Sequence, residues 1–91
     1  MLIKVTDVEA IGPHRLRVAF SDGSHGDIDM RKDIMSRTGP VVEPLRDPKF
    51  FSQVIVDYGA PTWPNGYDIC PVTLYDRMRE AGLLQPPDVA A

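Results

Sequence analysis

Apolar and polar residues alternate along the first third of the chain in a way that predicts three β-strands. The first strand is expected over residues 2–10, which are rich in Ile and Val. Its apolar positions change from odd numbers, such as Val5, to even numbers, such as Val8. A regular strand would then turn its two apolar halves to opposite faces, so we expect a β-bulge near Thr6-Asp7.

The next two strands, over residues 14–20 and 24–30, are predicted to form a hairpin. A two-residue Asp22-Gly23 loop would place Val18 opposite Asp27 and would mix core residues with aspartates on one face. A three-residue loop, with Gly23 in the left-handed conformation of a G1 bulge, separates the two kinds of residue. We therefore predict the three-residue loop. It pairs Leu16 with Ile28, Val18 with Gly26, Arg15 with Asp29 and Arg17 with Asp27.

The middle of the chain is predicted to hold two short helical segments with an extended connector between them. Residues 31–37 suit a short helix, and residues 41–45 suit the connector because a proline interrupts them. Asp47-Pro48 forms a helix start, with the acid at the N-cap and the proline at the first helical position. The turn that follows would direct Phe50 and Phe51 toward the core.

A second hairpin and one longer helix complete the pattern. Residues 54–58 suit a strand that Gly59-Ala60-Pro61 turns back into Thr62-Trp63. The helix is expected over residues 71–81, with Gly82 as its stop. Its apolar face is expected to carry Leu74, Tyr75, Met78 and Ala81.

These elements indicate an α+β fold, with small antiparallel sheets, short helical turns and one C-terminal helix packed on the sheet. A chain of 91 residues forms one domain, which we place at residues 1–84. Residues 85–91 contain Pro86-Pro87 and few groups to pack, so they are expected to form a flexible tail.

Composition and charge narrow the classes of function. A net charge of −3 and a pI of about 5.1 argue against a protein that binds nucleic acid by neutralising phosphates. The single cysteine excludes an internal disulfide. No uninterrupted apolar stretch suits a signal peptide or a membrane span, so we expect a cytoplasmic location and no membrane partner.

The most distinctive motif is Trp63-Pro64-Asn65-Gly66-Tyr67-Asp68. Pro64 fixes a backbone angle, and Asn65-Gly66 supplies the freedom that a tight turn needs. Asp68 could accept hydrogen bonds from the free N–H groups at the start of the following helix. Tryptophan is also enriched in binding hot spots, so the motif is the predicted partner-binding site. Its members are Trp63, Pro64, Asn65, Gly66, Tyr67 and Asp68.

Two other groups of residues could carry chemistry, and the sequence favours neither. Cys70 lies at the predicted helix start, where a thiol pKa falls, but His14 and His25 belong to far corners of the first hairpin. The acids of that hairpin look like metal ligands along the sequence, yet the predicted register sets arginines opposite Asp27 and Asp29. We therefore expect no catalytic residue, no metal site and no cofactor.

Four motifs together resemble one known family. They are Val18-Ala19-Phe20-Ser21-Asp22-Gly23, Asp27-Ile28-Asp29-Met30, Pro44-Leu45-Arg46-Asp47-Pro48-Lys49-Phe50-Phe51, and Trp63-Pro64-Asn65-Gly66 followed by Asp68, Pro71, Leu74 and Tyr75. On these motifs the chain resembles, over roughly residues 1–81, the bacterial family called domain of unknown function 2442. Tyr67 and Cys70 depart from the family pattern, which more often has a small residue and a helix-capping acid there.

The resemblance implies a small α+β domain and no established activity. It also implies an antitoxin-like role, because members often lie beside another small uncharacterised protein in bacterial genomes, and such pairs have been proposed as toxin–antitoxin modules. The leading hypothesis is therefore a non-enzymatic protein-interaction module whose partner is another small protein encoded nearby.

The sequence leaves two alternative functions open. One is a nucleic-acid-binding regulator, which the acidic charge disfavours, and the other is a small thiol enzyme built on Cys70. An open edge of so small a sheet would also allow a homodimer.

Overall fold

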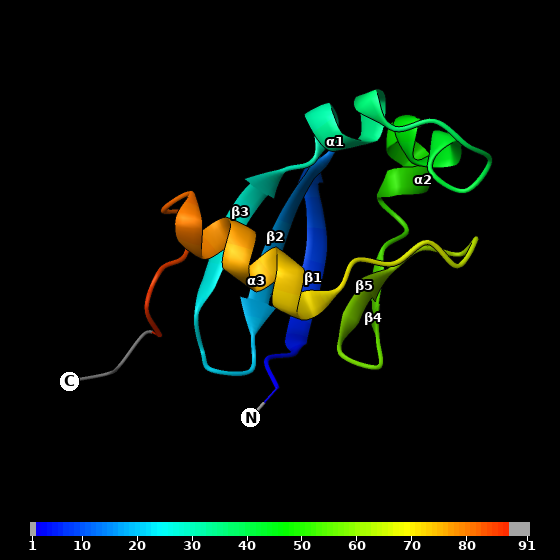
Figure 1. The fold of residues 1–91 in the computed structure, drawn as a ribbon. Coiled ribbons are helices and arrows are strands. Elements are labelled where there is room, and N and C mark those ends of the chain that lie inside the picture. The colour runs from blue at the N-terminus through cyan, green and yellow to red at the C-terminus, as the bar shows by residue number, and fades with distance from the viewer. Residues whose placement is uncertain (1, 88–91) are drawn as a thin grey trace.

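The computed structural model describes residues 2–87 of the 91-residue chain and shows two antiparallel sheets and a C-terminal helix (Figure 1). The first sheet has the strand order β1 (Val5–Gly12), β2 (Arg15–Phe20) and β3 (His25–Asp29), and the second pairs β4 (Ile55–Asp57) with β5 (Ala60–Thr62). Three short helices, α1 (Arg31–Ser36), η1 (Glu43–Arg46) and α2 (Pro48–Phe51), lie between the sheets in sequence. Helix α3 (Pro71–Glu80) crosses one face of the first sheet, and the predicted α+β fold class is confirmed.

The register predicted for the first hairpin is confirmed at every pair. Leu16 lies opposite Ile28 and Val18 lies opposite Gly26, while the two arginines of β2 lie opposite Asp29 and Asp27. The Phe20 N–H donates to the Ser24 carbonyl at 2.8 Å, which closes the three-residue loop. Gly23 has a φ of 88°, in the left-handed region that this loop requires.

The predicted bulge in β1 is also present, as a register shift between Val5 and Asp7. The strand itself begins three residues later than predicted, at Val5, and continues to Gly12. The Val5 N–H donates to the Gly59 carbonyl at 2.8 Å. This bond joins the β4–β5 hairpin to the edge of the first sheet.

The extended connector predicted over residues 41–45 is wrong, because the chain forms the 3₁₀-helix η1 there. Pro44 occupies the first turn of η1, where its missing N–H leaves no hydrogen bond unmade. The Leu45 N–H donates to the Val42 carbonyl at 3.0 Å, and the Leu45 side chain is fully buried. Burial of Leu45 thus stabilises a turn that proline alone would not specify.

The predicted starts of α2 and α3 are confirmed. In α2, the Asp47 carboxylate accepts from the Lys49 N–H at 2.9 Å, and Phe51 at the end of the helix is fully buried. Helix α3 begins after Cys70 with proline at its first position. Both helices therefore begin with proline at the first position, and α2 also has the predicted side-chain cap.

Helix α3 ends in a Schellman motif at the predicted glycine. Gly82 has a φ of 71°, the Leu83 N–H donates to the Met78 carbonyl at 2.8 Å, and the Gly82 N–H donates to the Arg79 carbonyl at 3.1 Å. Leu74 and Met78 are buried on the sheet as predicted. Ala81, by contrast, is the C-cap of the helix and is exposed.

The chain beyond α3 returns to the first sheet. The Leu83 carbonyl passes so close to Gly26 that any Cβ there would collide with it. Gln85 then forms an isolated antiparallel bridge with His25. Gln85 is the first residue of the predicted tail, and residues 88–91 of that tail lie outside the described residues.

Candidate interaction surface

Trp63 anchors the predicted binding motif from within the core. Its side chain is only 2% exposed, and the indole Nε1–H donates to the Phe51 carbonyl at 2.8 Å. The ring also packs against Phe51, with 5.5 Å between the ring centroids. Trp63 therefore holds the motif in place and offers no surface to a partner.

The residues after Trp63 form the predicted tight turn. The Gly66 N–H donates to the Trp63 carbonyl and the Trp63 N–H donates to the Tyr67 carbonyl, both at 2.9 Å. Gly66 has a φ of 89°, which is unfavourable for residues with a side chain. The Asn65 Oδ1 accepts from the Tyr67 N–H at 3.2 Å, which is the backbone mimicry expected of asparagine in a turn.

The turn is tied to a second loop that the sequence did not connect with it. The Asn65 Nδ2–H donates to the Val41 carbonyl at 2.7 Å, across 24 positions of sequence. A hollow of about 410 Å³ lies at this junction and is lined by residues 37–42 and by Tyr67. We call the exposed and half-buried residues of this region the turn surface: Pro40, Val41, Pro64, Asn65, Gly66, Tyr67 and Asp68.

Asp68 does not cap α3 as predicted. The N-cap is Cys70, two residues later, and Asp68 instead bridges to Thr62 through the backbone. The Asp68 side chain is exposed on the turn surface. Pro64, Asn65 and Gly66 are also exposed and Tyr67 is half-buried, so their role in partner binding stays a prediction.

Cys70 is an exposed thiol at the start of α3. The backbone of Thr73, at the start of the helix, lowers the pKa of the Cys70 thiol below its ordinary value. Cys70 lines a hollow of about 170 Å³ together with Asp33, Asp68 and Arg77, and among the described residues no histidine lines it. His14 lies in the turn before β2, where its ring contacts Arg46 and Phe51, and His25 begins β3, so neither lines the hollow beside this thiol.

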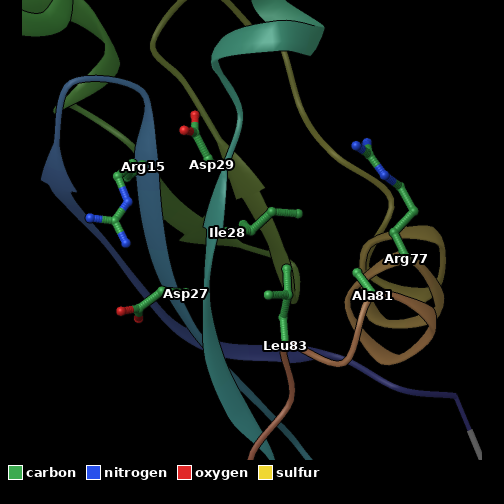
Figure 2. Close-up of a pocket in the computed structure, with 7 residues that line it drawn as sticks. All are labelled: Arg15, Asp27, Ile28, Asp29, Arg77, Ala81 and Leu83. Carbon is green, nitrogen blue, oxygen red and sulfur yellow. The ribbon is translucent and has the colours of Figure 1, made fainter.

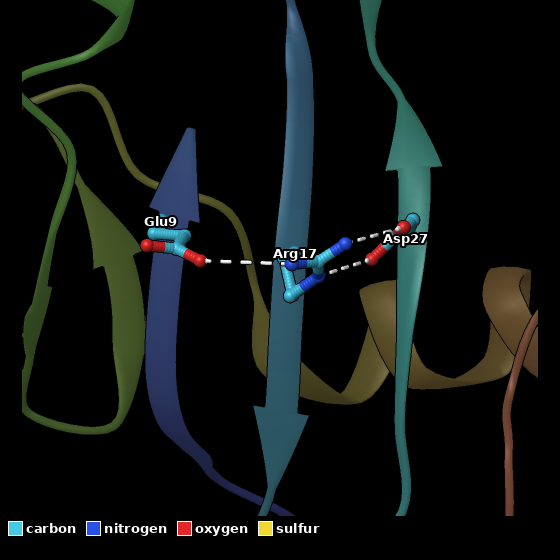
Figure 3. A network of polar contacts seen from close by, with 3 residues as sticks. All are labelled: Glu9, Arg17 and Asp27. Carbon is cyan, nitrogen blue, oxygen red and sulfur yellow. Dashed lines mark hydrogen bonds and ion pairs between the residues drawn. The ribbon is translucent and has the colours of Figure 1, made fainter. Parts of the chain in front are cut away.

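The acids of the first hairpin each have a separate partner. Asp27 pairs with Arg17, whose Nε lies 3.0 Å from the carboxylate, and Glu9 joins the same arginine from β1 at 3.9 Å (Figure 3). The hydrogen bond from Arg17 lowers the pKa of Asp27. Asp29, although opposite an arginine as predicted, accepts from the Arg31 N–H at 2.9 Å and so fixes the start of α1.

Asp22 links the first hairpin to α3. Its carboxylate accepts from the Ser24 N–H at 2.9 Å and the Ser24 hydroxyl at 2.6 Å, and it also accepts from the Tyr75 hydroxyl at 2.7 Å. Hydrogen bonds from Ser24, and then from Tyr75, lower the pKa of Asp22, and the same bond to Asp22 raises the pKa of Tyr75. Within residues 2–87, no three His, Cys, Asp or Glu side chains gather as a metal site would require.

A family model described as "Protein of unknown function (DUF2442)" matches residues 5–80. The chain belongs to this family. The DUF2442 match includes both hairpins, the turn surface and all of α3, so it covers the fold and the candidate site together. The family resemblance predicted from the sequence motifs is thereby confirmed.

The DUF2442 chain is also similar to a crystal structure from Nitrosomonas europaea ATCC 19718, described as that of a "Putative DNA Binding Protein". The two share 25% sequence identity with a TM-score of 0.63, and the match covers 91% of this chain and 63% of that chain. A comparison with curated proteins gives no match. Among the described residues, no helix of the DUF2442 chain is long and apolar enough to cross a membrane.

His14 is a residue of the DUF2442 domain whose role the sequence did not reveal. It sits between β1 and β2 with a φ of 61°, and its side chain is 4% exposed. The ring Nε2 lies 2.9 Å from the Arg46 carbonyl, and the ring meets Phe51 edge-on. Local sequence patterns could not predict this contact, because His14 and Arg46 are 32 positions apart.

Proposed function

We propose that this DUF2442 domain is a non-enzymatic protein-interaction module and that the turn surface contacts its partner. The observation that carries the proposal is the way the turn is held. Trp63 fixes the turn to the core, and Asn65 fixes it to the loop that contains Val41. A surface that is ordered before binding loses little conformational entropy on association, which favours a specific interface.

The chemistry of the turn surface suits a protein partner. The Val41 side chain is 47% exposed, and the exposed rings of Pro40 and Pro64 add further apolar area. Tyr67 brings an aromatic ring, which packs on Trp63 with 5.7 Å between centroids. Apolar and aromatic residues at the centre of a patch, with polar groups around them, are typical of protein interfaces.

The test is capture of the partner by the domain carrying Val41→Asp, which places a charge on the turn surface and leaves the backbone acceptor of Asn65 intact. The matched control is Ile55→Asp, on the β4 strand, where the side chain is 59% exposed. We expect Val41→Asp to lose most of the captured partner and Ile55→Asp to retain it. Equal capture by both variants would contradict the assignment of the turn surface.

The antitoxin-like role is the most specific form of this proposal. Here the partner is the small protein encoded beside this chain, and the domain neutralises its toxicity. Co-expression of the two, followed by copurification and a growth assay, tests this form. A stable complex with restored growth supports it, whereas growth inhibition that the domain does not relieve contradicts it.

DNA binding is a second candidate function, favoured by the description of the similar Nitrosomonas europaea protein. More than a third of that protein has no counterpart in the match, which covers 63% of its chain. This chain carries a net charge of −3, which opposes binding to phosphates. Mobility-shift assays decide the matter: a complex with duplex DNA that dissociates steeply with added salt would favour DNA binding, and no complex at low salt would dismiss it.

A further inference from the structure

The outer edge of β3 exposes backbone hydrogen-bonding groups. His25 exchanges two backbone hydrogen bonds with Gln85, of 3.1 and 2.7 Å, so its N–H and C=O point away from β2. Because these groups alternate along an antiparallel strand, Asp27 and Asp29 direct theirs to the same outer side. Met30 confirms the alternation, since its N–H donates inward to the His14 carbonyl at 2.7 Å. Within residues 2–87, no backbone group pairs with Asp27 or Asp29 on the outer side.

A hollow of about 640 Å³ lies along this edge of β3, between the strand and the end of α3 (Figure 2). Figure 2 shows Asp27 and Asp29 on one side of the strand and Ile28 on the other, facing Leu83 and Ala81. A second hollow continues along the same edge toward His25 and Gln85. The edge is therefore open beside the strand over Asp27 to Asp29, and Gln85 already occupies the neighbouring position.

We propose that the β3 edge binds an extended segment of another protein as an added strand, and that this segment alternates basic and apolar residues. The edge lies apart from the turn surface, so the proposal does not depend on the turn surface being a binding site. The bridge between Gln85 and His25 shows that β3 accepts backbone pairing on this side. The added segment would extend that pairing to Asp27 and Asp29.

The alternation follows from the two faces of the strand. A residue paired with Asp27 or Asp29 points to the same face as these carboxylates. Arg17 of β2 already pairs with Asp27, whereas no ion pair to Asp29 is formed within residues 2–87. Lysine or arginine opposite Asp29 therefore gives the most favourable cross-strand pair. Residues between these positions point to the opposite face, where Ile28, Leu83 and Ala81 offer apolar atoms. Arg77 of α3 also lines this side, and its guanidinium pairs with Asp33. A segment with one basic and one apolar face thus matches both sides of the edge.

Charge also argues against a second copy of this chain as the occupant. Two β3 strands pairing antiparallel about Ile28 would set Asp27 of each copy opposite Asp29 of the other. A shift of two residues would set an aspartate opposite its own equivalent. Like charges directly opposite one another destabilise a strand pair, so the edge selects a basic partner and disfavours self-association.

The test uses an acetylated and amidated Lys-Val-Lys-Val-Lys-Val peptide as the probe and records amide hydrogen exchange of the full chain by NMR. We expect the peptide to slow exchange at the Asp27 and Asp29 amides. The variant Asp29→Asn removes the charge but keeps an oxygen that can accept from the Arg31 N–H. It is expected to bind the peptide about two- to fivefold more weakly. The control Asp57→Asn makes the same change at an exposed site on β4 and is expected to leave binding unchanged.

Each contrary result overturns the proposal. Equal binding of a Glu-Val-Glu-Val-Glu-Val peptide would show that the edge does not select basic residues. Equal binding of a peptide with methylated backbone nitrogens would show that the peptide does not pair with β3 as a strand. Slow exchange at Asp27 and Asp29 that grows with protein concentration, without peptide, would show a second copy at the edge. Because Val41→Asp leaves the β3 edge unchanged, a failure here is distinguishable from a failure of the turn surface.

Discussion

Trp63 ties the turn to the core through one buried hydrogen bond. The indole N–H satisfies the Phe51 carbonyl, and the same ring separates Phe51 from Tyr67. A buried carbonyl without a donor destabilises a fold more than the bond itself stabilises it, because the group has lost its water. The residue that is most distinctive in the sequence is thus a structural anchor, and the exposed residues after it form the surface.

We predict that the single substitution Trp63→Phe lowers the free energy of unfolding by about 1–3 kcal/mol, since it leaves the Phe51 carbonyl without a donor. Urea unfolding followed by circular dichroism measures the change. Tyr58→Phe is the control, because the Tyr58 side chain is 98% exposed, and its midpoint should not move. An unchanged midpoint for Trp63→Phe would show that this bond is not a major contribution.

At the scale of elements, the close approach between β3 and the chain after α3 explains one residue of the hairpin. Val18 faces a glycine because the Leu83 carbonyl occupies the space where a side chain at position 26 would lie. The Schellman motif at Gly82 aims Leu83 at that point. The cap at the end of α3 therefore requires glycine at position 26 of β3.

We predict that Gly26→Ala lowers the free energy of unfolding by about 1–3 kcal/mol, as expected when extra volume enters a tightly packed site. Thermal unfolding measures the effect. Gly12→Ala is the matched control, since nothing lies within 4 Å of a Cβ built there. Equal loss of stability in both variants would show that crowding by Leu83 is not the cause.

The elements also show what the sequence could and could not predict. The hairpin register followed from which residues may share a face, a rule that depends only on neighbouring strands. Helix η1 was missed because burial of Leu45, a tertiary contact, outweighs the extended preference around Pro44. The cap assigned to Asp68 failed by two residues, which local patterns do not resolve.

The turn surface and the β3 edge also differ in how much of each could be predicted from the sequence. The turn itself was predicted, because its residues are adjacent in sequence and each has a known role in turns. Its bond to Val41 was not, because 24 positions separate the two residues. The β3 edge depends on which strand lies outermost and on where α3 ends, and both are properties of the assembled fold.

At the scale of the whole molecule, the fold is elongated, with extents of 45 × 23 × 20 Å. One apolar core continues through this length, from the first sheet and α3 to the helices around Phe51. Hydrogen bonds join parts of the chain that are distant in sequence, among them the bond from the Val5 N–H to the Gly59 carbonyl and the bond from the Tyr75 hydroxyl to the Asp22 carboxylate. The second of these bonds involves a carboxylate, so it makes the stability of the molecule depend on pH.

We predict that the domain loses stability as pH falls below about 4, the ordinary pKa range of aspartate. The pKa values of Asp22 and Asp27 are lower in the folded chain than in the unfolded chain. Their carboxylates therefore stabilise the fold above the unfolded pKa, and this stabilisation is lost as pH falls through the folded pKa. Urea midpoints measured between pH 7 and pH 2 check the trend.

Asp22→Asn separates this effect from general acid unfolding. The variant should be less stable than the parent chain at pH 7, and the difference should shrink toward pH 2, where the parent carboxyl is protonated as well. A difference that stays constant with pH would mean that Asp22 contributes through its shape and not through its charge.

The burial of Trp63 next to Tyr67 has a practical consequence for the study of partners. The chain has a single tryptophan, so its tryptophan fluorescence comes from one position in the core, directly beneath Tyr67 of the turn surface. A protein that docks on Tyr67 would alter the emission without touching the indole, and one that pairs with β3 would alter it far less. Emission from Trp63 can therefore distinguish a partner bound at the turn surface from one bound at the β3 edge, without any added label.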